Sequence, residues 1–213
     1  MDSNRVSDFI RQYIPAREEK LQKLREAAGE NHVPVIRSET EQFLRTLLLL
    51  LRPSRILELG TATGYSAILM AHTAEKLETV DTIEDWEPRL SEARINIDEA
   101  GLADKINLIA GDALEIMKTL TEPYDLVFID AAKGQYPQYL KEAVRLTHKG
   151  SVILADNILQ NGDILESKFS VERRDRTIHK RLREYLDRAS SDSRLATSII
   201  PIGDGVSLSV RCE

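Results

Sequence analysis

The 213-residue chain contains little cysteine, histidine or aromatic residue, and these shortages exclude several kinds of site. Its single cysteine, Cys212, allows neither an intrachain disulfide nor a zinc site made of cysteines. The four histidines are scattered along the chain, so any metal would need oxygen ligands. Aromatic residues make up 5% of the chain, which leaves little stacking surface for a planar ligand.

The chain also lacks a hydrophobic run that could span a membrane. The longest run, Leu47 to Leu51, lies between two arginines and is far shorter than the roughly 20 residues of a transmembrane helix. The first twenty residues are rich in charge, so we expect no signal peptide and a cytoplasmic location. A net charge of −6 gives no general attraction to nucleic acid or membranes, and polyanion binding would need a local basic patch.

The length suits one α/β domain over residues 1–213, with a helical segment over 1–52 and a Rossmann-like core over 53–213. Residues 2–29 predict two short helices separated near Pro15. A third helix is expected from Ser38 to Leu51, where Ser38 and Glu41 have the spacing of a capping box.

The rest of the chain alternates apolar strands with helices, and several strands read as buried on both faces. Strands are predicted at Arg55–Leu59, Glu78–Ile83, Ile106–Ala110, Asp125–Ile129, Ser151–Ala155, Thr197–Pro201 and Val206–Arg211. Helices are predicted at Tyr65–Thr73, Glu87–Ala100, Ala113–Leu120 and Tyr136–Thr147. The short connection between the last two strands predicts an antiparallel hairpin. We therefore expect an α/β fold with a Rossmann-like, mostly parallel seven-stranded sheet and helices on both faces.

A glycine-containing turn, Gly60 to Gly64, joins the first predicted strand to its helix. Its G-x-x-x-G spacing is neither the dinucleotide-binding nor the P-loop pattern, and no lysine follows to meet a phosphate. A ligand with a carboxylate and a ribose, such as S-adenosylmethionine, fits better. Ser66 could bind the carboxylate, Glu84 at the next strand end could accept the ribose hydroxyls, and Gly111–Ala113 could flank the adenine. The alternative is a structural turn without a ligand.

Polar side chains also follow the fourth and fifth predicted strands. Asp130 ends one, and Asp156 and Asn157 end the other, so they should converge if the strands are neighbours. Two carboxylates and an amide oxygen suit Mg²⁺ or a similar ion. Lys133 could accept a proton from a substrate hydroxyl. The alternative is that both aspartates cap helices and that Lys133 is an exposed loop lysine.

These segments resemble the metal-dependent catechol and caffeoyl-CoA type O-methyltransferases, through ILELGTATGYSAILMA, TIE, GDA, FIDAAKGQY and ADN between Pro34 and Arg211. The resemblance implies seven strands, a homodimer, S-adenosylmethionine and a divalent metal. It implies that Glu58, Gly60 and Ser66 line the methionine side of the cofactor site, with a backbone contact near Ile36. It places Glu84 on the ribose, Asp112 and Ala113 beside the adenine, Asp130 at both cofactor and metal, Asp156 and Asn157 on the metal, and Lys133 as the base.

Within that family the chain resembles bacterial tRNA 5-hydroxyuridine methyltransferases, through HVP, DAAKGQY, IPIGDG and a basic segment after the fifth strand. The resemblance implies methylation of a wobble hydroxyuridine in the tRNA anticodon region. The candidate RNA-binding residues are Arg173, Arg174, Arg176, Lys180 and Arg181. The alternative for this segment is an amphipathic helix with Ile178, Leu182, Tyr185 and Leu186 inward.

Three other functions stay open from the sequence. The same site could methylate a small catechol-like or acyl-CoA-linked phenol, because a catechol also presents two vicinal oxygens. A nicotinamide-dependent dehydrogenase would use a similar sheet, but the missing G-x-G-x-x-G disfavours it. A non-catalytic binding module would not need the set Asp130, Lys133, Asp156 and Asn157.

Overall fold

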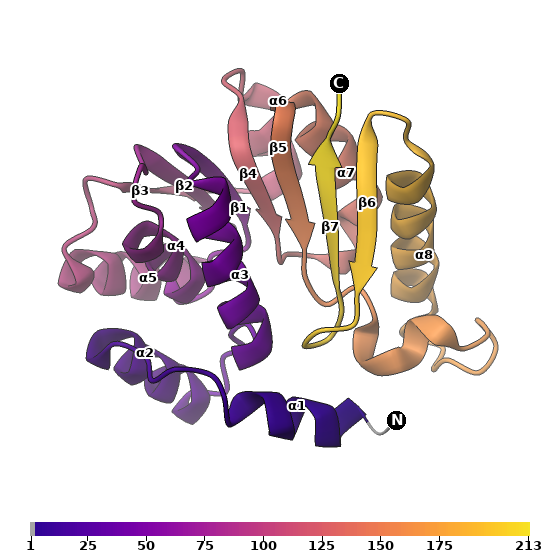
Figure 1. Ribbon diagram of the computed structural model, residues 1–213, viewed down its shortest axis with the longest axis horizontal. Helices are drawn as coiled ribbons and strands as arrows, with labels where there is room; N and C mark the ends of the chain where they lie inside the picture. The colour runs from indigo at the N-terminus through magenta and orange to yellow at the C-terminus, as the bar shows by residue number, and fades with distance from the viewer. Residues whose placement is uncertain (1–2) are drawn as a thin grey trace.

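The computed structural model describes residues 3–213, in which seven strands form one sheet between two helical layers (Figure 1). The strand order is β3-β2-β1-β4-β5-β7-β6. The strands are β1 (Arg55–Leu59), β2 (Thr79–Glu84), β3 (Ile106–Ala110), β4 (Tyr124–Ile129), β5 (Thr147–Ala155), β6 (Leu195–Ile200) and β7 (Val206–Arg211). β1 to β5 are mutually parallel, whereas β7 runs antiparallel to both β5 and β6. The predicted fold class is confirmed.

The helices divide between the two faces because successive strand residues point to opposite sides. The helices are α1 (Ser3–Arg11), α2 (Glu19–Glu30), α3 (Ser38–Leu51), α4 (Tyr65–Thr73), α5 (Glu87–Ala100), α6 (Ala113–Thr119), α7 (Tyr136–Arg145) and α8 (Arg176–Ser191), with 3-10 turns η1 (Lys133–Gln135) and η2 (Gln160–Leu165). Ile56 of β1 packs in the cluster formed with α2 to α5, and Leu57 in the cluster formed with α6 to α8. Among the described residues no helix combines the length and apolarity needed to cross a bilayer.

The chain order of the parallel strands determines where a ligand can bind. The chain runs from β1 outward to β2 and β3, and then returns to add β4 and β5 on the other side of β1. The connections after β1 and β4 therefore leave toward opposite faces, and the crevice between their carboxyl ends is the usual ligand site of such sheets. Gly60 and Asp130, the residues that follow β1 and β4, meet at this point.

Several boundaries differ from those predicted, and one local prediction is wrong. Ser38 and Glu41 do not form a capping box: Ser38 Oγ accepts a hydrogen bond from Arg17, and α3 has no side-chain cap. The Glu41 carboxylate instead binds Arg17 and Arg25, at 2.8 and 3.1 Å. β5 begins at Thr147 instead of Ser151, so α7 ends at Arg145.

Candidate active site

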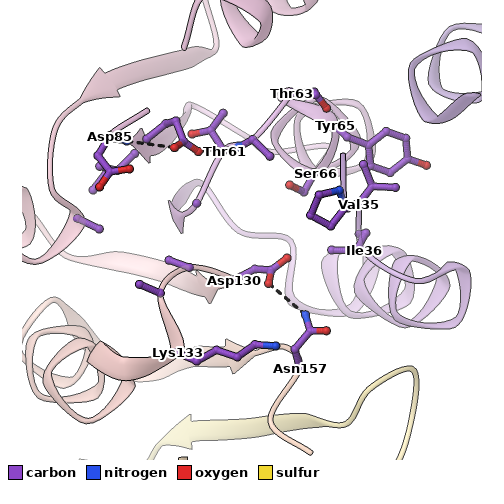
Figure 2. Close-up of a pocket in the computed structure, with 18 of the residues that line it drawn as sticks. Val35, Ile36, Thr61, Thr63, Tyr65, Ser66, Asp85, Asp130, Lys133 and Asn157 are labelled. Atoms are coloured by element: carbon purple, nitrogen blue, oxygen red, sulfur yellow. Dashed lines mark hydrogen bonds between the residues drawn. The ribbon is translucent and has the colours of Figure 1, made fainter. Parts of the chain in front are cut away.

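A cavity of about 530 Å³ opens at the carboxyl ends of the parallel strands and collects most of the predicted site residues (Figure 2). Its lining includes Ile36, Gly60, Ser66, Glu84, Asp112, Ala113, Asp130, Lys133 and Asn157. Two predicted site residues, Glu58 and Asp156, are not part of the lining, since their exposed fractions are 0% and 2%. We call the region of Glu84, Asp85 and Asp112 the β2–β3 end, and that of Asp130, Lys133 and Asn157, with Asp156 behind, the β4–β5 end.

The turn after β1 requires glycine at Gly60 for two reasons. Its φ of 92° lies in the left-handed region, where a side chain is strained. A Cβ there would also collide with the backbone carbonyl oxygen of Asp130. The turn ends at Gly64, and α4 begins without a side-chain cap. Free N–H groups and Ser66 therefore border the cavity, as in many sites for a carboxylate or phosphate.

Glu84, at the end of β2, holds the glycine turn from the other side. Its carboxylate accepts hydrogen bonds from the backbone N–H groups of Ala62 (2.9 Å), Trp86 (3.1 Å) and Asp85 (3.2 Å). Asp112 accepts from the Glu115 N–H at 3.0 Å and so caps α6 while it lines the cavity. Both carboxylates keep lone pairs for ligand hydroxyls, because each ionised carboxylate has about four acceptor sites.

Glu58 lies under the turn instead of in the cavity. Its Oε2 accepts a hydrogen bond from Thr82 Oγ1 at 2.5 Å, and its Oε1 is buried beside Ser66. Burial raises the pKa of Glu58 to about 8. At neutral pH the side chain is therefore mostly protonated, and it can support Ser66 and Thr82 without adding a charge beneath the cavity.

The β4–β5 end brings the three predicted metal ligands together. Asn157 Nδ2 donates to Asp130 Oδ1 at 3.1 Å, and the Asn157 N–H donates to Asp156 Oδ1 at 2.7 Å. Burial, with the neighbouring Asp130 charge, raises the pKa of Asp156 to about 7. Burial also raises the pKa of Asp130. The two acids share a buried region with too little positive charge, which a cation would supply.

Asn157 reaches this position through an unusual backbone. Its φ of 57° is in the left-handed region, which asparagine tolerates better than most residues. Within residues 3–213 no group of three His, Cys, Asp or Glu side chains could hold a metal ion. A metal at Asp130 and Asp156 would therefore depend on the Asn157 amide oxygen as well.

Lys133 begins η1 and points toward Asn157 in Figure 2. Its positive charge lowers the pKa of Asp130 against the larger effect of burial. The side chain thus lines the cavity at the same end as the buried carboxylates. A basic nitrogen at this position can exchange a proton with a ligand hydroxyl.

Tyr136 supports the β4–β5 end from below. Its buried hydroxyl donates to the Asp156 carbonyl at 2.9 Å and lies 3.4 Å from the Ile129 carbonyl oxygen. Its ring packs edge-on against Tyr185 of α8, with 5.5 Å between centroids. Tyr136 therefore joins the ends of β4 and β5 just where the two aspartates begin. In the sequence this tyrosine is noted as part of FIDAAKGQY and as the start of a predicted helix, neither of which indicates this role.

The basic segment lies away from the cavity. Arg173 and Arg174 are exposed and precede α8, while the predicted inward residues Leu182 and Tyr185 are buried. Several of the candidate cations already have partners, since Arg174 pairs with Glu172 and Asp175, Arg181 pairs with Glu184, and Arg176 donates to the Val171 carbonyl. None of the five lines the cavity. RNA binding by this segment stays a prediction.

The cavity also contains residues that the sequence analysis did not select. They are Arg37, Thr61, Thr63, Tyr65, Asp85, Gln135 and Tyr139 among others. Thr61 and Asp85 adjoin motif residues, so reading one position further would have found them. Arg37 and Tyr139 carry no such signal, because only the tertiary fold brings them to the cavity.

Comparison with known proteins agrees with this site. Residues 12–212 match the O-methyltransferase family. A catechol O-methyltransferase of Niastella koreensis is 34% identical over 76% of this chain and 76% of that protein. A caffeoyl-CoA O-methyltransferase of Eucalyptus gunnii is 31% identical over 97% of this chain and 89% of that protein.

Solved structures of O-methyltransferases also resemble this chain. The O-methyltransferase TomG of Streptomyces achromogenes, which is involved in tomaymycin synthesis and was solved with S-adenosylmethionine, superimposes with a TM-score of 0.85. It is 27% identical to this chain, and the match covers all of both chains. With the family match over nearly the whole length, the chain belongs to the O-methyltransferase family.

Proposed function

We propose that the protein transfers the methyl group of S-adenosylmethionine to one of two vicinal oxygens on a small catechol-like phenol, with a divalent ion such as Mg²⁺. The observation that carries this proposal is one cavity that joins the uncapped start of α4 to the carboxylate pair and Lys133. The related catechol and caffeoyl-CoA O-methyltransferases support the choice of a phenol.

The β2–β3 end fits S-adenosylmethionine. Ser66 and the free N–H groups of α4 offer donors to its carboxylate, and Glu84 and Asp112 offer acceptors to its ribose and adenine. Because Gly60 has no Cβ, the turn can pass close to the Asp130 carbonyl oxygen and its backbone stays accessible to a ligand. Ile36 lines the cavity next to Ser66 and can contribute a backbone contact.

The β4–β5 end fits a hard divalent cation. Asp130, Asp156 and Asn157 would supply oxygen ligands, which Mg²⁺ prefers, and the charge shortage between the two aspartates would be relieved. When bound, the ion would orient the acceptor oxygens and favour ionisation of the hydroxyl.

In the proposed reaction Lys133 Nζ acts in its neutral amine form: it takes the proton from the acceptor hydroxyl and becomes the ammonium. The oxygen then forms a bond to the methyl carbon while the carbon–sulfur bond breaks, and its electron pair stays on sulfur to give S-adenosylhomocysteine. The protein's task is to hold the oxygen, the methyl carbon and the sulfur in line, because the cofactor carries the reactive group.

The tRNA substrate and the homodimer remain predictions. A wobble hydroxyuridine would present the same pair of oxygens, and the exposed residues Arg173 and Lys180 are available to a phosphate backbone. The related proteins are named as catechol and caffeoyl-CoA O-methyltransferases, which favours a phenol as the substrate. Light scattering of the purified protein would establish the oligomeric state.

The test is transfer of label from S-adenosylmethionine to catechol, and separately to tRNA that carries unmethylated 5-hydroxyuridine, with Mg²⁺ or with chelator. We expect chelator-sensitive labelling of catechol that is lost in Asp156→Ala. Labelling of tRNA alone would replace the phenol by RNA. No labelling of either, with S-adenosylmethionine bound, would reject both substrates.

A further inference from the structure

Apart from Asp130, the charged side chains that line the cavity are sorted by sign. Glu84, Asp85 and Asp112 are all acidic and gather at the β2–β3 end. The two cations that line the cavity are Lys133, after β4, and Arg37, just before α3. The proposed function uses Lys133, whereas it gives Arg37 no role.

Arg37 is held beside the β4–β5 end by two hydrogen bonds. Its Nη2 donates to Asn161 Oδ1 at 2.9 Å, in the loop that follows Asn157. Its Nη1 donates to the Gly203 carbonyl at 3.2 Å, in the turn between β6 and β7. The side chain crosses directly over Gly203, because a Cβ there would lie 3.7 Å from Arg37 Cδ. The guanidinium therefore lies near the loop of the metal ligands.

Both partners of Arg37 are neutral. The acidic residues of the adjoining first turn of α3 are already paired, Glu39 with Arg11 and Glu41 with Arg17 and Arg25. Among residues 3–213 no carboxylate forms an ion pair with Arg37. A guanidinium has five N–H donors, of which two are used here, so a cation with free donors and no ion-pair partner within the described residues borders the cavity; the buried acid next to Gly203, Asp204, accepts the Asn161 N–H instead.

We propose that Arg37 binds a carboxylate on the methyl acceptor, so that the preferred substrates are catechols that carry an acid group. This inference rests on the proposed function. A planar guanidinium pairs with a carboxylate through two parallel hydrogen bonds and thereby fixes its orientation. The cofactor's own carboxylate is the other source of this chemistry, but Ser66 and the start of α4 already offer it donors.

The experiment compares catechol with 3,4-dihydroxybenzoate in steady-state methylation and in calorimetric binding to the protein loaded with Mg²⁺ and S-adenosylhomocysteine. Wild type should prefer the acid, and Arg37→Gln should lower that preference roughly 10- to 100-fold, the usual effect of a charged hydrogen-bonding pair. Arg94→Gln is the matched control, since it makes the same substitution at an exposed position of α5 outside the cavity. This control should keep the preference for the acid.

The inference would be overturned by no preference for the acid in wild type, by equal losses on both compounds in Arg37→Gln, or by the same change in Arg94→Gln. Weaker binding of S-adenosylhomocysteine in Arg37→Gln, with an unchanged acid preference, would assign Arg37 to the cofactor and also overturn it. Failure of the proposed function is distinguishable. Acid binding that depends on Arg37, without turnover of either compound, would support the anion site and reject the catechol reaction.

Discussion

The two ends of the cavity balance their charges differently. At the β2–β3 end the protein's own backbone donates hydrogen bonds to the carboxylates: Glu84 accepts three from N–H groups and Asp112 accepts one. At the β4–β5 end Asp130 and Asp156 share the donors of Asn157, and burial raises the pKa of both. The first end is organised without a ligand, whereas at the second burial disfavours the ionised forms of Asp130 and Asp156, which a bound divalent cation would stabilise.

The largest expected effect breaks the β4–β5 end alone. Asp156→Asn should lower methyl transfer by at least about 100-fold, because it removes a ligand that orients the acceptor and the charge that attracts the ion. Binding of S-adenosylhomocysteine, measured by calorimetry in chelator, should change by less than about 2-fold, since that ligand uses the other end.

The control for this change is Asp104→Asn, an exposed acid outside the cavity, which should leave both measurements as in wild type. A large loss of cofactor binding in Asp156→Asn would contradict the independence of the two ends.

Glu84→Gln is the reciprocal change. The amide keeps the shape but replaces an anionic acceptor of three N–H bonds and of the ribose hydroxyls, so binding of S-adenosylmethionine should weaken by roughly 10- to 30-fold. The affinity for Mn²⁺, followed by electron paramagnetic resonance, should stay as in wild type. Glu87→Gln, at an exposed position on α5, serves as the matched control. Parallel losses of metal and cofactor binding would show that the two ends are coupled.

Tyr136→Phe tests whether the β4–β5 end depends on support from below. Loss of the hydroxyl frees the carbonyls of Asp156 and Ile129, and metal affinity should fall about 10-fold, as for other groups that orient ligands. Tyr185→Phe is the control, because it also deletes a buried hydroxyl. That hydroxyl is hydrogen-bonded to Ser207 Oγ at 2.6 Å and not to the backbone of the proposed metal ligands. Both variants should lose thermal stability, but only Tyr136→Phe should lose Mn²⁺ affinity. Equal affinities would make Tyr136 a packing residue.

The sequence predicted the order of the elements and the strand-end residues well. Apolar runs such as ILEL and LVFI are local signals for buried strands, and parallel strands necessarily bring Gly60, Glu84, Asp112 and Asp130 to one edge. The capping box at Ser38 failed because distant arginines compete for Glu41. That competition depends on tertiary contacts of Arg17, before α2, and Arg25, within α2, which no local pattern encodes.

The sequence also could not predict how deeply the site residues are buried or which other residues hold them in place. Strand alternation does not show that Glu58 and Asp156 are withdrawn from the cavity surface, since that depends on the turns above them. The roles of Tyr136 and Arg37 depend on carbonyls of segments that are distant along the chain, at Ile129 and at Gly203. The position of the basic residues before α8 likewise depends on where that helix begins, which is at Arg176.

The smallest expected effect concerns Glu58, which is an exception near the well-compensated end because it is buried with one oxygen unpartnered. Its pKa is raised by burial from 4.5 to about 8, so the folded protein holds a proton that the unfolded chain releases. The stability from that proton is fully present below the unfolded pKa and is lost as the pH rises through about 8. Asp130 and Asp156 contribute in the same direction when no metal is bound.

Glu58→Gln, which imitates the protonated acid, should therefore match wild type near pH 4 and have the higher melting temperature near pH 9. Differential scanning calorimetry in chelator from pH 4 to about pH 9 measures how the two melting temperatures diverge. Asp156→Asn under the same conditions separates the β4–β5 contribution, which Mg²⁺ should also remove in wild type. If the melting temperature of Glu58→Gln falls with pH as steeply as that of wild type, the pH dependence comes from Asp130 and Asp156. The β4–β5 end would then differ still more from the β2–β3 end.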